Sequence, residues 1–388
     1  MTRWPQIQGT AAELLAEARS STSIEIVDEE AVEPLTMLLH SYNESARFTP
    51  DGAAMKRRDV SRILKNRLRM SRDLAAHPEI LDIELLPPLL INALPRTGST
   101  KMQKTLAATG DFNFLPYWMC MNSASASGVP YEDVSNRIAD VQAYSDWFGQ
   151  ASPRTKNGHD MSPHEPEEEA YILMQSLLAR SLGGFAKADD YVVWLGSQDL
   201  GHQYRYLHDT LRYLVWQGLA DPAKPFLLKC VVNLGLEAEI RQALPNVNFA
   251  VMHRDPVSVV PSASLLGQVF RAAYSDQPVD MSHNPARHAG AMNQHLAYRA
   301  ANPDEPFHDI CYDRARADAR SVIEGIYEFA GVELTADTFT NADRWEADNP
   351  QHKHGAWSYA ATDFGFTDDD VRREFAGYID WIHDRGIC

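Results

Sequence analysis

The stretch Leu89-Leu90-Ile91-Asn92-Ala93-Leu94-Pro95-Arg96-Thr97-Gly98-Ser99-Thr100-Lys101 decides which fold we expect. It begins as a short apolar run, breaks at Pro95, and passes one glycine and two hydroxyl residues before a helix-like segment, residues 101–108. A strand, a tight loop and a helix N-terminus in this order form an anion site, because loop N–H groups converge and the helix dipole favours negative charge. The side chains able to donate to phosphate oxygens are those of Arg96, Ser99, Thr100 and Lys101.

This loop differs from the Walker A phosphate loop, which needs G-x-x-x-x-G-K-[ST]. Position 94 is leucine rather than glycine, and the loop reads R-T-G-S-T. The stretch therefore predicts a phosphate ligand without ordinary ATP hydrolysis.

Composition and charge narrow the class of protein. The chain has 388 residues, of which 44% are hydrophobic and 23% charged, as in a globular protein with a large core. Its 36 Lys and Arg residues against 53 Asp and Glu give a net charge of −17, which argues against a general nucleic-acid or anionic-membrane surface. A polyanionic ligand must therefore meet a few locally concentrated basic side chains.

The cysteines and the N-terminus suggest no extracellular or membrane character. Cys120, Cys230, Cys311 and Cys388 are far apart and form no CxxC pair, so neither a structural zinc site nor a disulfide framework is expected. The first residues lack the apolar core of a signal peptide, and no apolar run approaches the length of a membrane span. We expect a cytoplasmic protein without integral membrane contact.

Residues 1–85 have a helical pattern and predict an N-terminal extension or cap, followed by an α/β domain over residues 86–388. Residues 55–76 are basic. They form either a polyanion-binding face or, as we favour, a solvated helix face with Ile63, Leu64 and Leu68 turned inward.

Downstream, short apolar runs at 226–232, 249–253 and 307–312 alternate with helical patterns. This order predicts an α/β fold with a P-loop-like parallel sheet flanked by helices. A strong helical pattern covers 170–182. The aromatic segment 112–121 reads as core filling, although its position after the anion loop also suits an apolar acceptor pocket.

A second basic element raises the specificity of the anion-site prediction. Arg254 ends the run at 249–253, and Ser262 follows eight positions later. Ligands of open α/β sheets bind at the carboxyl edge of the strands, so both elements can face one ligand with two phosphate groups. The structural alternative for Arg254 is an ion pair with Asp255 or another neighbour.

These motifs together resemble the sulfotransferases that use 3′-phosphoadenosine-5′-phosphosulfate (PAPS), over about residue 88 to the C-terminus. Leu94 to Thr100 is similar to the 5′-phosphosulfate loop in the P-R-T-G-[ST]-T form of bacterial members. His253-Arg254-Asp255-Pro256 with Ser262 resembles the 3′-phosphate motif, and Lys353-His354-Gly355 resembles the C-terminal loop that closes over that phosphate. The resemblance implies that the cofactor-binding residues are Arg96, Thr97, Gly98, Ser99, Thr100, Lys101, Arg254, Ser262, Lys353, His354 and Gly355.

Two further segments, His159-x-Met161 with Pro166-Glu167-Glu168 and Leu228-Lys229-Cys230, are similar to the bacterial subgroup. Sulfuryl transfer is an in-line displacement whose charge spreads over equatorial oxygens, so we expect Arg96 and Lys101 to stabilise the transferring group and expect no metal. The general base is left open among four residues: Glu167, Glu168, His159 and His164. Helix capping by the two glutamates and loop hydrogen bonding by the histidines are the structural alternatives. Lys229 is either a cofactor contact or a strand-end salt bridge.

The predicted function is transfer of the sulfuryl group of PAPS to a hydroxyl of a partly apolar small molecule or glycolipid. The rivals are a P-loop kinase or NTPase, which lacks its Gly-Lys-[ST] signature here, and a nucleotide-binding protein that has lost catalysis. The sequence predicts no nucleic-acid partner. It leaves the acceptor and the oligomeric state open, a homo-oligomer included.

Overall fold

The core of the fold is a parallel β-sheet. The computed structural model describes residues 4–159, 161–350 and 357–388. Within these ranges the sheet has five strands in the order β2-β3-β1-β4-β5, all parallel. The strands are β1 (Leu89–Ala93), β2 (Asn113–Phe114), β3 (Phe226–Lys229), β4 (Asn248–His253) and β5 (Phe307–Cys311). The α/β prediction is confirmed, and β2 is a short edge strand that the sequence pattern did not indicate.

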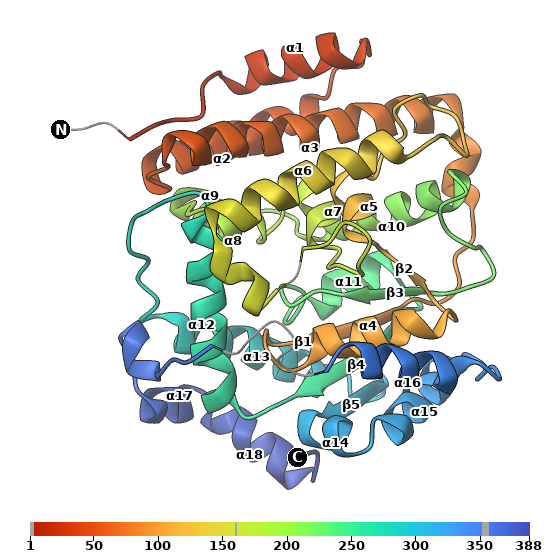
Figure 1. Ribbon diagram of the computed structural model, residues 1–388, viewed down its shortest axis with the longest axis vertical. Helices are drawn as coiled ribbons and strands as arrows, with labels where there is room; N and C mark the ends of the chain where they lie inside the picture. The colour runs from red at the N-terminus through yellow and green to blue at the C-terminus, as the bar shows by residue number, and fades with distance from the viewer. Residues whose placement is uncertain (1–3, 160, 351–356) are drawn as a thin grey trace.

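The central strands are continuous apolar runs because both faces of the sheet are covered. Every residue of β1 is buried. Leu90 packs into a core cluster with Leu228 and Phe249, whereas Leu89 and Ile91 belong to the cluster on the opposite face. Alternate residues of β1 therefore face opposite sides of the sheet, and the sheet separates two layers of helices (Figure 1).

Helices cover both faces of the sheet. Against the face of Leu89 and Ile91 lie α4 (Ser99–Thr109), α14 (Tyr312–Ala317), α15 (Ala319–Ala330) and α16 (Thr338–Asp348). Against the other face lie α5 (Tyr117–Met121), α6 (Ser135–Ala151), α7 (Ala170–Gln175), α8 (Leu182–Phe185), α9 (Asp189–Leu195), α10 (Gly201–Trp216) and α11 (Glu237–Ala243). Helices α12 (Pro256–Ala272), α13 (Asn284–Ala301), α17 (Asp368–Glu374) and α18 (Ala376–Asp384) form a third cluster. Single 3₁₀ turns are η1 (Glu29–Ala31), η2 (Pro78–Asp82), η3 (Pro153–Asn157) and η4 (Ala361–Phe364).

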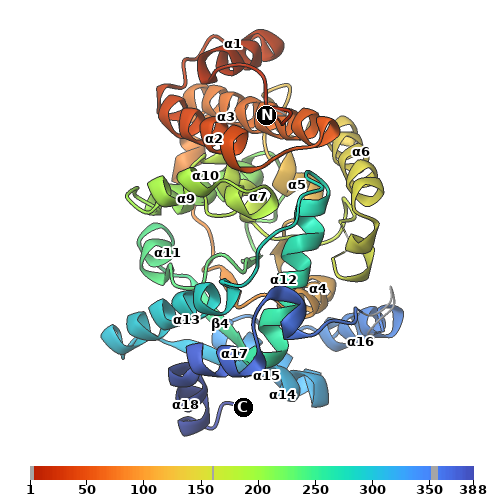
Figure 2. The same cartoon turned by 90° about the vertical axis from the view of Figure 1, so that its left-hand side faces the viewer.

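The predicted N-terminal helices are α1 (Ala11–Thr22), α2 (Val32–Ser45) and α3 (Pro50–Ala76). They lie at the end of the molecule opposite α18 and the C-terminus (Figures 1 and 2). One continuous core cluster contains Leu14 of α1, Leu35 of α2, Leu64 of α3 and Leu90 of β1. The N-terminal helices therefore share a core with the sheet layer, and the division of the chain at residue 86 stays a prediction.

The basic helix α3 is only partly the solvated face that the sequence favoured: Ile63, Leu64 and Leu68 are buried as predicted, and Arg58 is exposed. Lys56 and Arg67 are buried, and six of the basic side chains lie in ion pairs with carboxylates. The partners are Asp59 for Lys56 and Arg62, Glu17 for Arg57, Asp140 for Arg58 and Arg62, Asp28 for Arg67, and Asp73 for Arg72. Asp59 and Asp73 belong to α3 itself, whereas Glu17, Asp28 and Asp140 come from other segments, which the charge pattern of one helix could not reveal.

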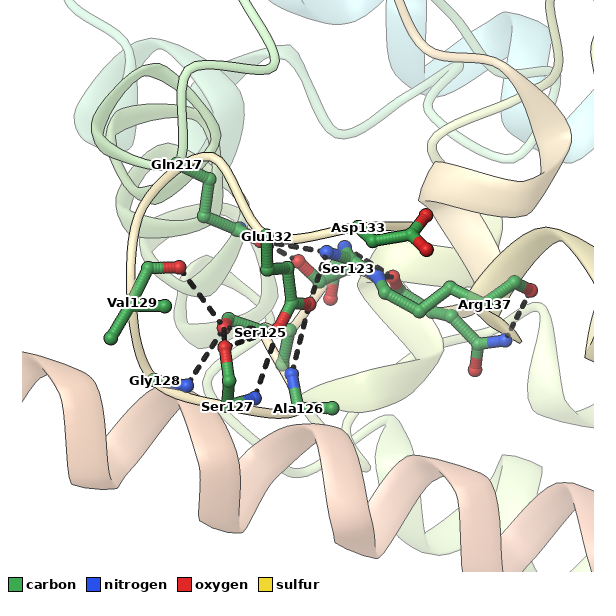
Figure 3. A network of polar contacts seen from close by, with 12 residues as sticks. Ser123, Ser125, Ala126, Ser127, Gly128, Val129, Glu132, Asp133, Arg137 and Gln217 are labelled. Atoms are coloured by element: carbon green, nitrogen blue, oxygen red, sulfur yellow. Dashed lines mark hydrogen bonds and ion pairs between the residues drawn. The ribbon is translucent and has the colours of Figure 1, made fainter. Parts of the chain in front are cut away.

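The loop between α5 and α6 is closed by a polar network around Glu132 (Figure 3). Its carboxylate accepts hydrogen bonds from the backbone N–H groups of Ala126 and Ser127 and from the hydroxyls of Ser125 and Ser127. Although burial opposes ionisation, these bonds lower the pKa of Glu132 to about 2. Arg137 extends the network from Glu132 to the Asn122 carbonyl, which fixes the start of α6.

Two sequence predictions are corrected. The helix predicted over 170–182 ends at Gln175 because Leu177 has a positive φ of 62°, and a second helix, α8, begins at Leu182. Cys311 and Cys388, expected to be unpaired, form a disulfide with 5.3 Å between their Cα atoms. The C-terminal segment brings Cys388 back to the end of β5, a contact that a separation of 77 residues does not signal. In the described ranges, no helix combines the length and the apolar character that a membrane span requires.

Candidate functional site

The loop between β1 and α4 has the geometry of an anion site. Arg96 and Gly98 have positive φ angles of 70° and 88°, and Gly98 is the N-cap of α4. Thr97 donates its hydroxyl to the Leu94 carbonyl at 2.9 Å, so its side chain holds the loop together. A Cβ on Gly98 would lie 2.8 Å from Cδ2 of Tyr312. The loop thus presents the first N–H groups of α4, which has no acidic residue in its first turn.

Arg96, Arg254 and Ser262 converge beside this loop. The Nε of Arg96 donates to the Ser262 hydroxyl at 3.0 Å, and its Nη1 donates to the Gly158 carbonyl at 3.0 Å. The Nη1 of Arg254 donates to the Arg96 carbonyl at 2.8 Å, while its guanidinium lies 4.1 Å from the ring centre of Tyr312. The structure therefore brings together the predicted 5′ and 3′ phosphate elements.

Neither guanidinium has a carboxylate within ion-pair distance among the described residues. Asp255, the alternative partner of Arg254, instead accepts the N–H of Val257 at 2.9 Å and caps α12. Burial lowers the pKa of Arg96, and the nearby charge of Arg254 acts in the same direction. Two uncompensated positive charges beside a helix N-terminus favour a bound polyanion.

Lys229, at the end of β3, connects the loop to the predicted acidic segment. Its buried Nζ donates to the Thr100 hydroxyl at 3.1 Å and forms an ion pair with Glu168. Although burial opposes its charge, Glu168 raises the pKa of Lys229. Lys229 is thus a strand-end salt bridge that also touches the loop, and neither Glu167 nor Glu168 caps α7, whose N-cap is Glu169.

His159 and Glu167 form the second polar pair of the site. His159 Nε2 lies 2.8 Å from Glu167 Oε2, and the other oxygen of Glu167 accepts the Glu168 N–H at 2.8 Å. Burial opposes ionisation of Glu167, but the charge and hydrogen bond of His159 hold its pKa below the usual value. Gln103 of α4 donates to the Glu167 carbonyl at 3.0 Å, and His159 follows the Gly158 that Arg96 contacts. The pair is therefore fixed against both the loop and its arginine.

Glu169, the third residue of the acidic triplet, is fully buried. Its oxygens accept hydrogen bonds from the Lys229 backbone N–H at 2.8 Å and from the Asn233 side chain at 2.7 Å. Burial raises its pKa to about 7 despite these bonds. The acidic triplet thus has three roles: Glu167 pairs with histidine, Glu168 with lysine, and Glu169 is a buried acid.

Some predicted residues lie apart from this cluster. Lys101 forms an ion pair with Glu346 of α16 at 3.1 Å, and His164 is exposed. Lys353, His354 and Gly355 lie outside the described residues. Trp357 follows the predicted Lys353-His354-Gly355 loop. Its ring lies 5.3 Å from the Arg96 guanidinium, and its indole N–H is buried without a partner in the described part of the chain. The resemblance placed Trp357 beside the cofactor loop but did not signal its contact with Arg96.

The described residues include no cluster of metal ligands at the site. Across residues 4–159, 161–350 and 357–388, no group of three or more His, Cys, Asp or Glu side chains is arranged to hold a metal ion.

Comparisons with known proteins agree with this geometry. A family model described as the sulfotransferase family matches residues 87–337. Sulfotransferase STF1 from Mycobacterium tuberculosis H37Rv is similar in structure, with a TM-score of 0.79, 24% identity, and coverage of 96% of this chain and 100% of that one. Sulfotransferase STF9 from Mycobacterium avium has a TM-score of 0.82 and 24% identity, with 96% of each chain covered. No curated protein matches the sequence.

Proposed function

The chain belongs to the sulfotransferase family, and on that premise we propose that it moves the sulfuryl group of PAPS to a hydroxyl of a partly apolar small molecule or glycolipid. The observation that carries the proposal is the meeting of Arg96, Arg254 and Ser262 at the N-terminus of α4. A nucleotide with a 5′-phosphosulfate and a 3′-phosphate is a polyanion with two separate charged ends, which these groups match.

Each of these groups has a distinct role in the proposal. Arg254, stacked on Tyr312, and the Ser262 hydroxyl hold the 3′-phosphate. The N–H groups at the start of α4, with the hydroxyls of Ser99 and Thr100, hold the 5′-phosphate. Arg96 lies between the two elements, where its fixed charge stabilises the transferring group and the leaving phosphate oxygen. Because guanidinium stays protonated at neutral pH, Arg96 acts electrostatically and not as an acid.

His159 is the proposed general base. Its Nε2 faces Glu167, so Nδ1 is the nitrogen left to accept the proton of the acceptor hydroxyl. As the acceptor oxygen forms its bond to sulfur, the bond between sulfur and the 5′-phosphate oxygen breaks, and the hydroxyl proton moves to His159. Glu167 stabilises the resulting imidazolium and orients the ring, since both of its oxygens are already engaged. Among the four candidates, the geometry favours His159 because Glu168 is paired with Lys229 and His164 is exposed.

The proposal is tested by incubating the protein with PAPS that carries radiolabelled sulfur and a panel of phenols, aliphatic alcohols and glycolipids, in the presence of a chelator. We expect a labelled sulfate ester and an equal amount of 3′-phosphoadenosine-5′-phosphate (PAP). Thermal stabilisation by ATP with magnesium but not by metal-free PAP, together with no ester, would sink the proposal.

A further inference from the structure

A small cavity lies between α3 and helices α5 to α8. Its volume is about 40 Å³, and its lining includes Lys56, Asp59 and Arg62 of α3 with Tyr144, Tyr171 and Phe185. Basic groups at the end of an aromatic-lined space are unusual in a core, because burying a charge is costly unless it is paired. The charged side chains of the lining should therefore have partners nearby.

Arg62 has one donor group that no residue in the described part of the chain accepts. Its Nη1 donates to Asp59 at 3.1 Å and its Nε to Asp140 at 3.3 Å. Its side chain is only 9% exposed, yet the buried Nη2 has no acceptor among the described residues. Because a buried N–H without a partner costs free energy, this nitrogen favours a ligand that supplies an oxygen.

The carboxylates around Arg62 are already occupied. Asp59 accepts hydrogen bonds from Lys56 at 3.1 Å, from the Tyr274 hydroxyl at 3.1 Å and from Arg62. Asp140 accepts from Arg58 as well as Arg62. The Asn122 side chain also donates to Asp140 at 3.1 Å, while the Asn122 backbone carbonyl accepts a hydrogen bond from Arg137.

The cavity lining itself contains two cations, Lys56 and Arg62, and one carboxylate, Asp59. The lining therefore carries more positive than negative charge, and Arg62 Nη2 is a donor without an acceptor among the described residues.

A row of partly buried aromatic side chains lies between the cavity and the proposed base. The ring of His159 lies 5.5 Å from that of Phe270, and Phe270 lies 5.1 Å from Phe185, which lines the cavity. From Phe185 the Lys56 ammonium is 5.8 Å away. An acceptor with its hydroxyl at His159 and its body along these rings would extend toward Lys56 and Arg62.

We propose that Arg62 and the α3 cavity recognise a carboxylate at the far end of the sulfotransferase acceptor. The acceptor is then an amphipathic hydroxy acid: a hydroxyl at His159, an apolar or aromatic body along Phe270 and Phe185, and an anionic end at Arg62. This inference rests on the proposed function for its assignment of the reacting end.

The size of the cavity agrees with an end group and not with a whole acceptor. A volume of about 40 Å³ holds roughly three spheres the size of a water molecule, which corresponds to the three heavy atoms of a carboxylate. One oxygen of a carboxylate can accept from Arg62 Nη2, and the charge of the carboxylate can offset the positive excess of the lining.

The test uses 4-hydroxyphenyl alkanoic acids of increasing chain length, each beside its neutral primary amide. Affinities are measured by calorimetry with PAP bound. At one or more chain lengths we expect the acid to bind about tenfold or more tightly than the amide, because a hydrogen bond to a charged group is the stronger. Equal affinities of acid and amide, or no binding of any acid, overturn the inference.

Three variants assign the preference to Arg62. Arg62→Gln is expected to lose the acid preference and Arg62→Lys to keep part of it. Arg58→Gln is the matched control: it removes a cation from the same helix and the same partner, Asp140, but the side chain is 45% exposed. Arg58→Gln should keep the preference. Because the ratio of acid to amide is taken within each variant, partial unfolding does not produce the result, and persistence of the ratio in Arg62→Gln overturns the inference.

Sulfate transfer from PAPS to the same compounds is measured separately. Selective acid binding without transfer would contradict the proposed function while supporting the anionic subsite. Sulfate transfer at equal rates to acid and amide would support the proposed function and contradict the anionic subsite.

Discussion

Removal of the Glu167 carboxylate is the perturbation that best separates the roles of the two polar residues at the proposed base. In Glu167→Gln the side chain keeps its size and can still hydrogen-bond His159, but it loses its negative charge. If His159 takes the proton, Glu167 contributes only by stabilising the imidazolium across the 2.8 Å contact. The effect of the Glu167 substitution must then depend on the presence of His159.

The magnitudes follow from this arrangement. A hydrogen bond to a charged group is worth about 1 to 2 kcal/mol more than a neutral one, so Glu167→Gln should lower kcat about tenfold. Loss of the general base in His159→Ala should lower kcat by roughly 10² to 10⁴. The double variant should be no slower than His159→Ala within about twofold, because the partner of Glu167 is already gone.

The assay is transfer of labelled sulfur at saturating PAPS, with the affinity for PAP measured in each variant to show that the nucleotide site is intact. The control is Glu165→Gln on the same segment, whose side chain is 40% exposed and pairs with Lys104 at 3.1 Å. This change should leave kcat within about twofold. A further tenfold loss on adding Glu167→Gln to His159→Ala, or a larger loss in Glu167→Gln than in His159→Ala, would show that Glu167 takes the proton itself.

Three further predictions concern the surroundings of the pair. Gly98→Ala adds a Cβ 2.8 Å from Tyr312 at a φ of 88°, so calorimetry should show at least about tenfold weaker PAP binding, and unchanged affinity would contradict the loop geometry. Lys229→Met leaves Glu168 unpaired and should lower the free energy of unfolding in urea by about 3 kcal/mol at neutral pH, and a change below about 1 kcal/mol would contradict it. The pKa of Glu169 is about 7 in the folded protein, against an ordinary value of 4.5. Between pH 4.5 and 7 the Glu169 carboxyl is therefore protonated in the folded state and ionised in the unfolded state. Its contribution to stability is present below pH 4.5 and falls by about 3 kcal/mol as pH rises to 7. Glu169→Gln should lack this decline, and parallel pH curves for the two proteins would refute it.

The order of strands, loops and helices could be predicted from the sequence because it depends on local signals. The apolar run of β1, the break at Pro95 and the glycine at 98 all act within a few residues, and the structure has a strand, a loop and the helix α4 there. The sequence predicted that the Arg96 loop and the element of Arg254 and Ser262 face one ligand, through the rule that parallel strands share a carboxyl edge. The direct hydrogen bond of Arg96 to Ser262 was not predicted.

Contacts between distant segments could not be predicted. The disulfide of Cys311 with Cys388 and the ion pair of Lys101 with Glu346 join residues whose own neighbours in sequence give no sign of the partner. The same holds for α3, where a row of basic residues reads as a solvated face until Asp140 of another helix is placed beside it. Charge patterns describe one element, whereas pairing depends on the packing of two.

The central claim is that Arg254 and the loop of Arg96 bind a nucleotide through two separate phosphate groups. The most direct measurement compares metal-free binding of PAP with that of adenosine 5′-phosphate, which lacks the 3′-phosphate, in the unmodified protein and in Arg254→Met. Two hydrogen bonds from a guanidinium to phosphate predict that PAP binds at least about 100-fold more tightly, and that Arg254→Met removes most of the difference. Equal affinity for the two nucleotides, or a PAP preference that survives in Arg254→Met, would contradict the account.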